Sequence, residues 1–106
     1  MEKKLPSAYR RFATDHPRII EAYEALGDAT LVDGPLDRRT AELVKLGIAI
    51  GARLEGAVHA HVRRARDAGA RAEDIRHAIR LATTTVGFPT MMSALSWAND
   101  VLTAAK

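Results

Sequence analysis

The stretch that most constrains the fold of this 106-residue chain is the run at residues 43–50, where Lys45 is the only charged residue. It lies within "DRRTAELVKLGIAIGARL", in which Asp37 is placed to act as the N-cap of a helix. A helix that is apolar on nearly every side is a buried one. The run therefore predicts a central helix that other helices surround. Within it, Gly47 and Gly51 lie four residues apart, a spacing that lets another backbone approach closely.

The remaining segments also have helical rather than strand periodicity. We expect helices in six ranges of the sequence. The first covers 7–14, and the second runs to residue 32 from an N-cap at Asp15, with Pro17 in its first turn. The third runs from Asp37 to a break between Gly51 and Gly56, and the others cover 54–68, 72–86 and 90–102. The β-branched "TTTV" at 83–86 is expected inside the fifth helix, and "GFP" at 87–89 ends that helix and starts the next. The sequence thus predicts an all-α fold, a compact bundle of five to six short helices forming one domain over residues 1–106.

Composition excludes several classes of protein. The chain has no cysteine, which removes disulfides, thiolate metal sites and thiol chemistry. Its net charge of +3 comes from basic residues dispersed among acidic ones, so we expect no nucleic-acid partner. The absence of a long apolar run or a leader-like N-terminus predicts no membrane association and a cytoplasmic location. A helical layer this small is marginal alone, so we expect self-association.

Two histidines stand two positions apart in "RLEGAVHAHVRRA", residues 53–65. On a helix, such residues point about 200° away from each other, so His59 and His61 cannot both bind one metal ion. Metal-binding helices space their histidines four apart, and no such pair occurs in the sequence. We therefore expect no metal site.

The neighbours of the two histidines also differ. His59 shares a polar row with Glu55, Arg63 and Arg66, which reads most simply as a solvated face. His61 shares a stripe with apolar residues, so its side chain is expected to point inward. His61 is then either a core residue whose ring nitrogens are hydrogen-bonded within the fold or a functional residue.

Glu42 bears on that choice because it is the last carboxylate before the apolar run. A buried carboxylate loses hydration unless it is paired. Arg53 lies eleven residues further on, nearly on the same face if the helix continues that far. A glutamate and a histidine between packed helices suit general acid–base catalysis, but they equally suit a pair that fixes helix packing. The residues alone leave both alternatives open.

Residues 34–89, about half the chain, resemble the carboxymuconolactone decarboxylase family, which includes the alkylhydroperoxidase D branch. The resemblance rests on "LDRRT", "HVRRA", "AGA" followed by "EDI", and the closing "GFP", which occur in the family's order. It implies an alkylhydroperoxidase D-like helical fold. In the peroxidase branch the site resembles E-x11-C-x2-C-x3-H. Counting from Glu42 places Leu54 and Ala57 at the cysteine positions and His61 at the histidine.

The glutamate and the histidine of that pattern are thus present as Glu42 and His61, and both cysteines are absent. Thiol peroxidase activity is therefore not expected. The decarboxylase branch works without cysteine, and the resemblance then implies cofactor-free loss of CO2 from a small carboxylated lactone or organic acid. That branch lacks a glutamate at the position of Glu42, so the substrate is left undefined.

The leading hypothesis is therefore a lyase with Glu42 and His61 as catalytic residues. Substrate-binding roles are expected for Arg53, Leu54, Ala57 and His59. No cofactor or metal is expected, and the partners are a small-molecule substrate and further copies of the chain, as a trimer or hexamer. The alternative is a catalytically silent oligomeric binding or scaffold relative of the alkylhydroperoxidase branch, in which Leu54 and Ala57 only fill space.

Overall fold

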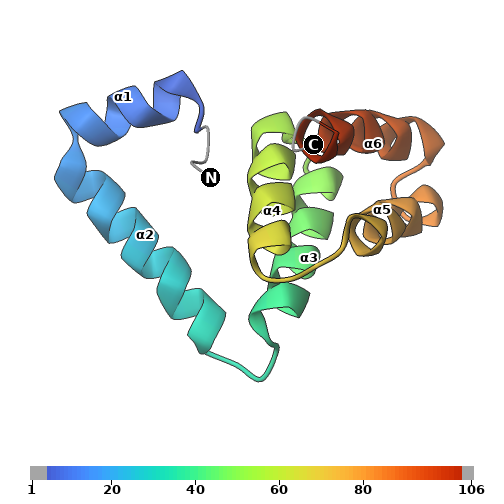
Figure 1. The fold of residues 1–106 in the computed structure, drawn as a ribbon, viewed down its shortest axis with the longest axis horizontal. Coiled ribbons are helices and arrows are strands. Elements are labelled where there is room, and N and C mark those ends of the chain that lie inside the picture. Colours follow the sequence, from blue (N-terminus) through green and yellow to red (C-terminus); the bar gives the residue numbers. More distant parts are fainter. Residues whose placement is uncertain (1–4, 104–106) are drawn as a thin grey trace. The chain divides into compact units, whose positions relative to one another are not determined.

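The computed structural model describes residues 5–103, and within that range it contains six α-helices, one 3-10 helix and no strand (Figure 1). The elements are α1 (Ser7–Asp15), α2 (Pro17–Val32), α3 (Arg38–Gly51), α4 (Glu55–Asp67), α5 (Ala72–Arg80), the 3-10 helix η1 (Leu81–Thr84) and α6 (Phe88–Leu102). The predicted all-α class is confirmed. None of the described helices has the length and apolar character needed to cross a membrane.

The chain divides into two structural units, with the boundary between Pro35 and Leu36. The first unit holds α1 and α2, neither of which contains a buried residue. Tyr9 on α1 donates a hydrogen bond of 2.8 Å from its hydroxyl to Oε2 of Glu24 on α2. A two-helix unit without a buried side chain has little apolar packing of its own to stabilise it.

The connection between α1 and α2 differs from the prediction. Asp15, expected as the N-cap of α2, is the last residue of α1 and forms an ion pair with Arg11 one turn earlier. His16 takes the N-cap position instead, and Pro17 follows as the first helical residue. The N-cap prediction was wrong because α1 extends to Asp15, which leaves His16 to precede the first helical residue of α2.

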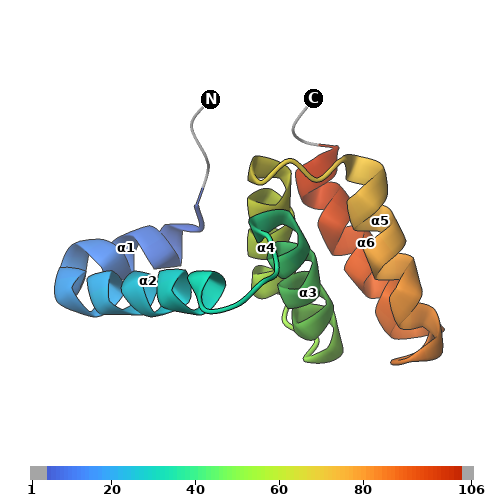
Figure 2. The same cartoon turned by 90° about the horizontal axis from the view of Figure 1, so that it is seen from below.

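The second unit contains the hydrophobic core. Helix α4 packs against α3 and α6, and α5 packs against α6 and α3, as the two views of Figures 1 and 2 show. The core consists almost entirely of small aliphatic side chains, namely Leu46, Ala49, Ile50, Val58, Val62, Ala65, Ala70, Ile75, Ile79, Met91, Ala94, Ala98 and Leu102. These residues recur on one face of each helix, which is the pattern expected of helices around a single core.

Helix α3 is buried on one side only. Leu46 is fully buried, whereas Val44 is 47% exposed and Ile48 is 66% exposed. A Cβ atom built on Gly47 would meet no atom within 4 Å, so no other described segment approaches this glycine closely. The prediction that α3 is surrounded on all sides is therefore wrong for the single chain, and an apolar face of α3 is left open.

The fifth helix is shorter than predicted. Helix α5 ends at Arg80, and "TTTV" lies in η1 and the turn that follows, rather than inside an α-helix. The hydroxyl of Thr83 donates a 2.7 Å hydrogen bond to the carbonyl oxygen of Arg80. Threonine hydroxyls compete for backbone acceptors in this way, and β-branched residues favour the end of a helix over its interior. Gly87, with φ +101°, then reverses the chain into α6, which begins at Phe88, two residues before the predicted start at residue 90.

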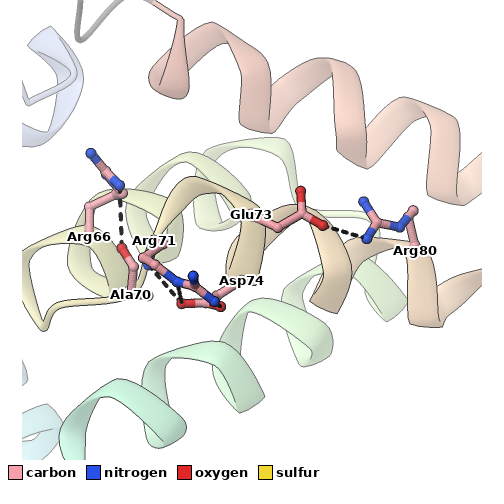
Figure 3. Close-up of polar contacts among 6 residues, drawn as sticks. All are labelled: Arg66, Ala70, Arg71, Glu73, Asp74 and Arg80. Atoms are coloured by element: carbon pink, nitrogen blue, oxygen red, sulfur yellow. Dashed lines mark hydrogen bonds and ion pairs between the residues drawn. The ribbon is translucent and has the colours of Figure 1, made fainter.

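The start of α5 is fixed by Asp74 (Figure 3). Its Oδ2 accepts a hydrogen bond of 2.9 Å from the backbone N–H of Arg71, and its Oδ1 accepts one of 2.8 Å from Nη2 of the same residue. Further along α5, Arg80 pairs with Glu73 at 2.8 Å, and before the helix Arg66 donates to the carbonyl oxygen of Ala70 (Figure 3). The hydrogen bonds from Arg71 lower the pKa of Asp74 to about 2.

This lowered pKa gives a prediction for acid unfolding. The folded state favours ionised Asp74, so its contribution to stability is present above the ordinary aspartate pKa of 3.8 and is lost as the pH falls from there towards 2. We expect Asp74→Asn to lower the melting temperature at pH 7 and the difference from wild type to shrink between about pH 4 and pH 2. Asp28→Asn, at an exposed position of α2, is the control. A difference that persists unchanged at pH 2 would rule out this role of the carboxylate.

Candidate functional site

Glu42 and His61 form a hydrogen-bonded pair between α3 and α4. Nδ1 of His61 lies 2.9 Å from Oε1 of Glu42. The side chain of Glu42 is fully buried, and that of His61 is 14% exposed. The two helices bring these residues together because each bears its polar group on the face that packs against the other. The pair therefore combines a dry carboxylate with an imidazole that is close to the surface.

The contact determines how His61 can handle a proton. When Glu42 is ionised it can only accept, so Nδ1 of His61 carries the hydrogen and donates it to Oε1. In that tautomer Nε2 bears the lone pair and is the atom available to a ligand. A carboxylate on Nδ1 also holds the ring in place. The arrangement suits a general acid or base acting through Nε2.

The second carboxylate oxygen of Glu42 is exceptional. Oε2 is buried and has no hydrogen-bond partner among the described residues. A buried acceptor without a partner costs about 1–3 kcal/mol, and buried polar groups are rarely left in this condition. A pair that served packing alone would be expected to satisfy both oxygens. Oε2 of Glu42 is therefore able to accept a further hydrogen bond.

Leu54 and Ala57 lie on the side of α4 that leads to His61, because residues three and seven positions apart share a helix face. Leu54 is the N-cap of α4 and is 54% exposed, and Ala57 is partly buried against the core. Along this side of α4, an exposed leucine is followed by a partly buried alanine and then by the histidine. It can offer a small apolar surface next to the imidazole.

Arg53 reaches its position differently from the prediction. Helix α3 ends at Gly51, and Arg53 has φ +58°, so the helix does not continue to place it on the face of Glu42. Its Nε donates a 3.2 Å hydrogen bond to Oγ1 of Thr90 on α6. An arginine at positive φ is uncommon and costs more than a glycine would there. The Nη groups of Arg53 have no hydrogen bond to another described residue, so they are available to a ligand.

His59 lies on the other side of α4 and contacts α6. Its Nε2 is 3.2 Å from Oδ2 of Asp100, and its side chain is 25% exposed. The polar row inferred from the sequence is thus partly covered by α6 rather than fully solvated. Because His59 and His61 point to opposite sides of the helix, we do not place His59 in the same site as His61.

Asp100, the partner of His59, and Thr90, the partner of Arg53, were not predicted from the sequence. Both lie on α6, 41 residues from His59 and 37 residues from Arg53 respectively. Neither belongs to a motif, and only the packing of α6 beside α4 brings Asp100 to His59. No local signal in one sequence could have found these contacts.

A groove of about 780 Å³ lies elsewhere on the second unit, between α3 and α5. Its lining combines apolar residues with two arginines, an aspartate and a histidine, namely Arg39, Thr40, Leu43, Val44, Gly47, Arg71, Asp74, His77, Ala78 and Leu81. Neither Glu42 nor His61 belongs to this lining. The Glu42–His61 pair therefore lies outside this groove.

Comparison with known proteins adds to this description. Residues 17–100 match the model of the carboxymuconolactone decarboxylase family. An uncharacterized protein of Haemophilus influenzae is 33% identical over 58 residues, which make up 55% of this chain and 51% of that protein. The chain thus spans about half the length of this curated relative.

The fold has a counterpart among solved structures. The crystal structure of the apo form of a carboxymuconolactone decarboxylase family protein from Legionella pneumophila superimposes with a TM-score of 0.78. The match covers 94% of this chain and 89% of that one, at 22% sequence identity. At this identity the likeness establishes a shared fold.

Proposed function

Because the chain belongs to the carboxymuconolactone decarboxylase family, we propose that it is a cofactor-free lyase that removes CO2 from a small carboxylated lactone or organic acid. The observation that carries this proposal is the Glu42–His61 pair, in which a fully buried carboxylate holds an imidazole that is 14% exposed. The unpartnered Oε2 of Glu42 supports it, because an incompletely satisfied buried group is more readily explained by chemistry than by packing.

The proposed reaction needs a proton donor, a place for the electron pair and a cation for the substrate carboxylate. The bond between the carboxylate carbon and the ring breaks, CO2 leaves, and the electron pair moves towards the lactone carbonyl. Nε2 of His61 then delivers a proton to the carbanionic carbon, and a proton from water restores the imidazole. Glu42 accepts a hydrogen bond from Nδ1 of the same ring and so holds the imidazole in place, with Nε2 turned towards the substrate.

The substrate carboxylate requires a cation, and we assign this role to Arg53. Its Nη groups can form two parallel hydrogen bonds to a carboxylate, and its Nε–Thr90 contact restricts the side chain. Leu54 and Ala57 supply apolar surface on the side of α4 that leads to His61. A thiol peroxidase reaction is not proposed, because the chain contains no cysteine.

The second candidate function is a silent oligomeric scaffold located, like the proposed enzyme, in the cytoplasm. It is favoured by the apolar side chains exposed on the second unit, which include Val44, Ile48, Leu81 and Phe88. Exposed apolar surface of this kind marks an interaction site. We propose that further copies of the chain cover it, as a trimer or hexamer, whether or not the protein is catalytic.

The lyase proposal predicts the effect of two substitutions on CO2 release from a panel of carboxylated lactones. His61→Ala and Glu42→Gln should each lower kcat/KM by about 100-fold or more, since a positioned acid–base group contributes that much. His77→Ala, at an exposed position of α5, is the matched control and should leave the rate unchanged. If the wild-type protein releases no CO2 from any member of the panel, or if His61→Ala is as active as wild type, the lyase proposal fails.

A further inference from the structure

We propose that Glu55, His59 and Asp100 bind a divalent transition-metal ion at the junction of α4 and α6. The three residues each offer one ligand atom, and these atoms all lie within 4.8 Å of one another. Glu55 and His59 are one turn apart on α4, and Asp100 is on α6, which packs against α4. The site would therefore join two helices.

One of the three distances between ligand atoms, now spanned by the hydrogen bond between His59 and Asp100, already equals that expected around a bound ion. Tetrahedral coordination with bonds of about 2.0–2.2 Å places neighbouring ligand atoms about 3.3 Å apart. Nε2 of His59 and Oδ2 of Asp100 are 3.2 Å apart, which matches one edge of such a site. Glu55 is exposed and has no hydrogen bond or ion pair with another described residue, so its flexible side chain can move to complete the third position.

The ligand set selects the kind of ion. One neutral imidazole with two carboxylates balances a charge of +2, and imidazole favours zinc, copper, nickel or iron over magnesium and calcium. Three protein ligands leave at least one position for water, as in zinc sites that are not closed by a fourth side chain. We therefore expect Zn²⁺ to bind and Mg²⁺ not to bind.

This site is independent of the proposed lyase chemistry. His59 and His61 point to opposite sides of α4, and the Glu42–His61 pair lies on the side that faces α3. A metal ion at His59 would hold α4 against α6 and stabilise the folded state, because it binds the folded arrangement of two helices and not the unfolded chain. The loss of one function thus leaves the other intact.

Titration calorimetry with Zn²⁺ alone tests the site. Wild-type protein should bind one ion per chain, and His59→Ala and Asp100→Asn should each weaken binding by tenfold or more. His77→Ala and Asp28→Asn remove the same side-chain types at exposed positions elsewhere and should bind as wild type does. The melting temperature of wild type, but not of His59→Ala, should rise when Zn²⁺ is added.

Each possible result of this titration either supports the metal site or overturns it. Folding of each variant is checked by circular dichroism without metal, and because all three ligands are at least partly exposed, the substitutions should not prevent folding. Equal Zn²⁺ affinity in wild type, His59→Ala and Asp100→Asn would show adventitious binding elsewhere and overturn the proposal. The absence of Zn²⁺ binding to wild type, or equal binding of Mg²⁺, would also overturn it.

Discussion

His61→Leu should lower the free energy of unfolding by about 3–5 kcal/mol, because it leaves the buried carboxylate of Glu42 without its only hydrogen-bond partner among the described residues. Replacing both members, as Glu42→Leu with His61→Leu, should restore stability to the wild-type value or exceed it by about 1–4 kcal/mol, since an apolar pair carries no desolvation cost. The measurement is urea unfolding at one fixed protein concentration.

The single variant Glu42→Leu is the control for this pair. It removes the fully buried group and leaves a histidine that is 14% exposed and can hydrogen-bond to water, so its effect should be smaller than that of His61→Leu. If the double variant were as unstable as His61→Leu, the pair would be a packing device, as the scaffold hypothesis requires. Recovery of stability would mean that the pair is kept at a cost to the fold.

Leu46→Ala should also have a large effect, a loss of about 2–5 kcal/mol. Leu46 is fully buried on α3 and belongs to the core of the second unit. Domains of this size have a total stability of about 5–15 kcal/mol, so the substitution removes a large share of it. Thermal or urea unfolding of the variant measures the loss. A loss below about 1 kcal/mol would contradict the packing of α3 in the core.

Ile48, two residues further along α3, provides the matched control. It is 66% exposed in the single chain, so Ile48→Glu should not weaken the core. If copies of the chain associate through this face, as we propose, the substitution should instead lower the mass measured by light scattering, because a charge on the open face of α3 opposes association. An unchanged mass would show that other surfaces, and not this face of α3, hold the copies together.

Much of the fold could be predicted from periodicity and turn residues. Asp37 accepts a hydrogen bond of 2.7 Å from the backbone N–H of Thr40 and caps α3 as expected. The break between α3 and α4 falls between Gly51 and Gly56, as predicted. Local rules suffice at such positions because the groups involved are three to five residues apart.

The errors occurred where tertiary contacts or competing local bonds decide the structure. The open face of α3 could not be distinguished from a buried one, because an apolar side chain has the same sequence signal in a core and at an interface. Arg53 would share the face of Glu42 only if the helix continued that far, and this condition is not met, because α3 ends at Gly51 and Arg53 has a positive φ. The partners of His59 and Arg53 on α6 are far away in the sequence, so only the packed helices reveal them.

The candidate site was predictable in part. Helical geometry separated His59 from His61, and the spacing from Glu42 pointed to His61 as its counterpart. The structure places Nδ1 of His61 2.9 Å from Oε1 of Glu42, within hydrogen-bond distance. The orientation of the ring and the unsatisfied oxygen of Glu42 depend on how α3 packs against α4, which the sequence does not specify.

The most direct test of the account is CO2 release from carboxylated lactones by the double variant Glu42→Leu with His61→Leu, measured beside wild type. The account predicts that wild type turns over at least one of these lactones and that the double variant, although as stable as wild type, loses activity by about 100-fold or more. A folded double variant that releases CO2 as fast as wild type would contradict it.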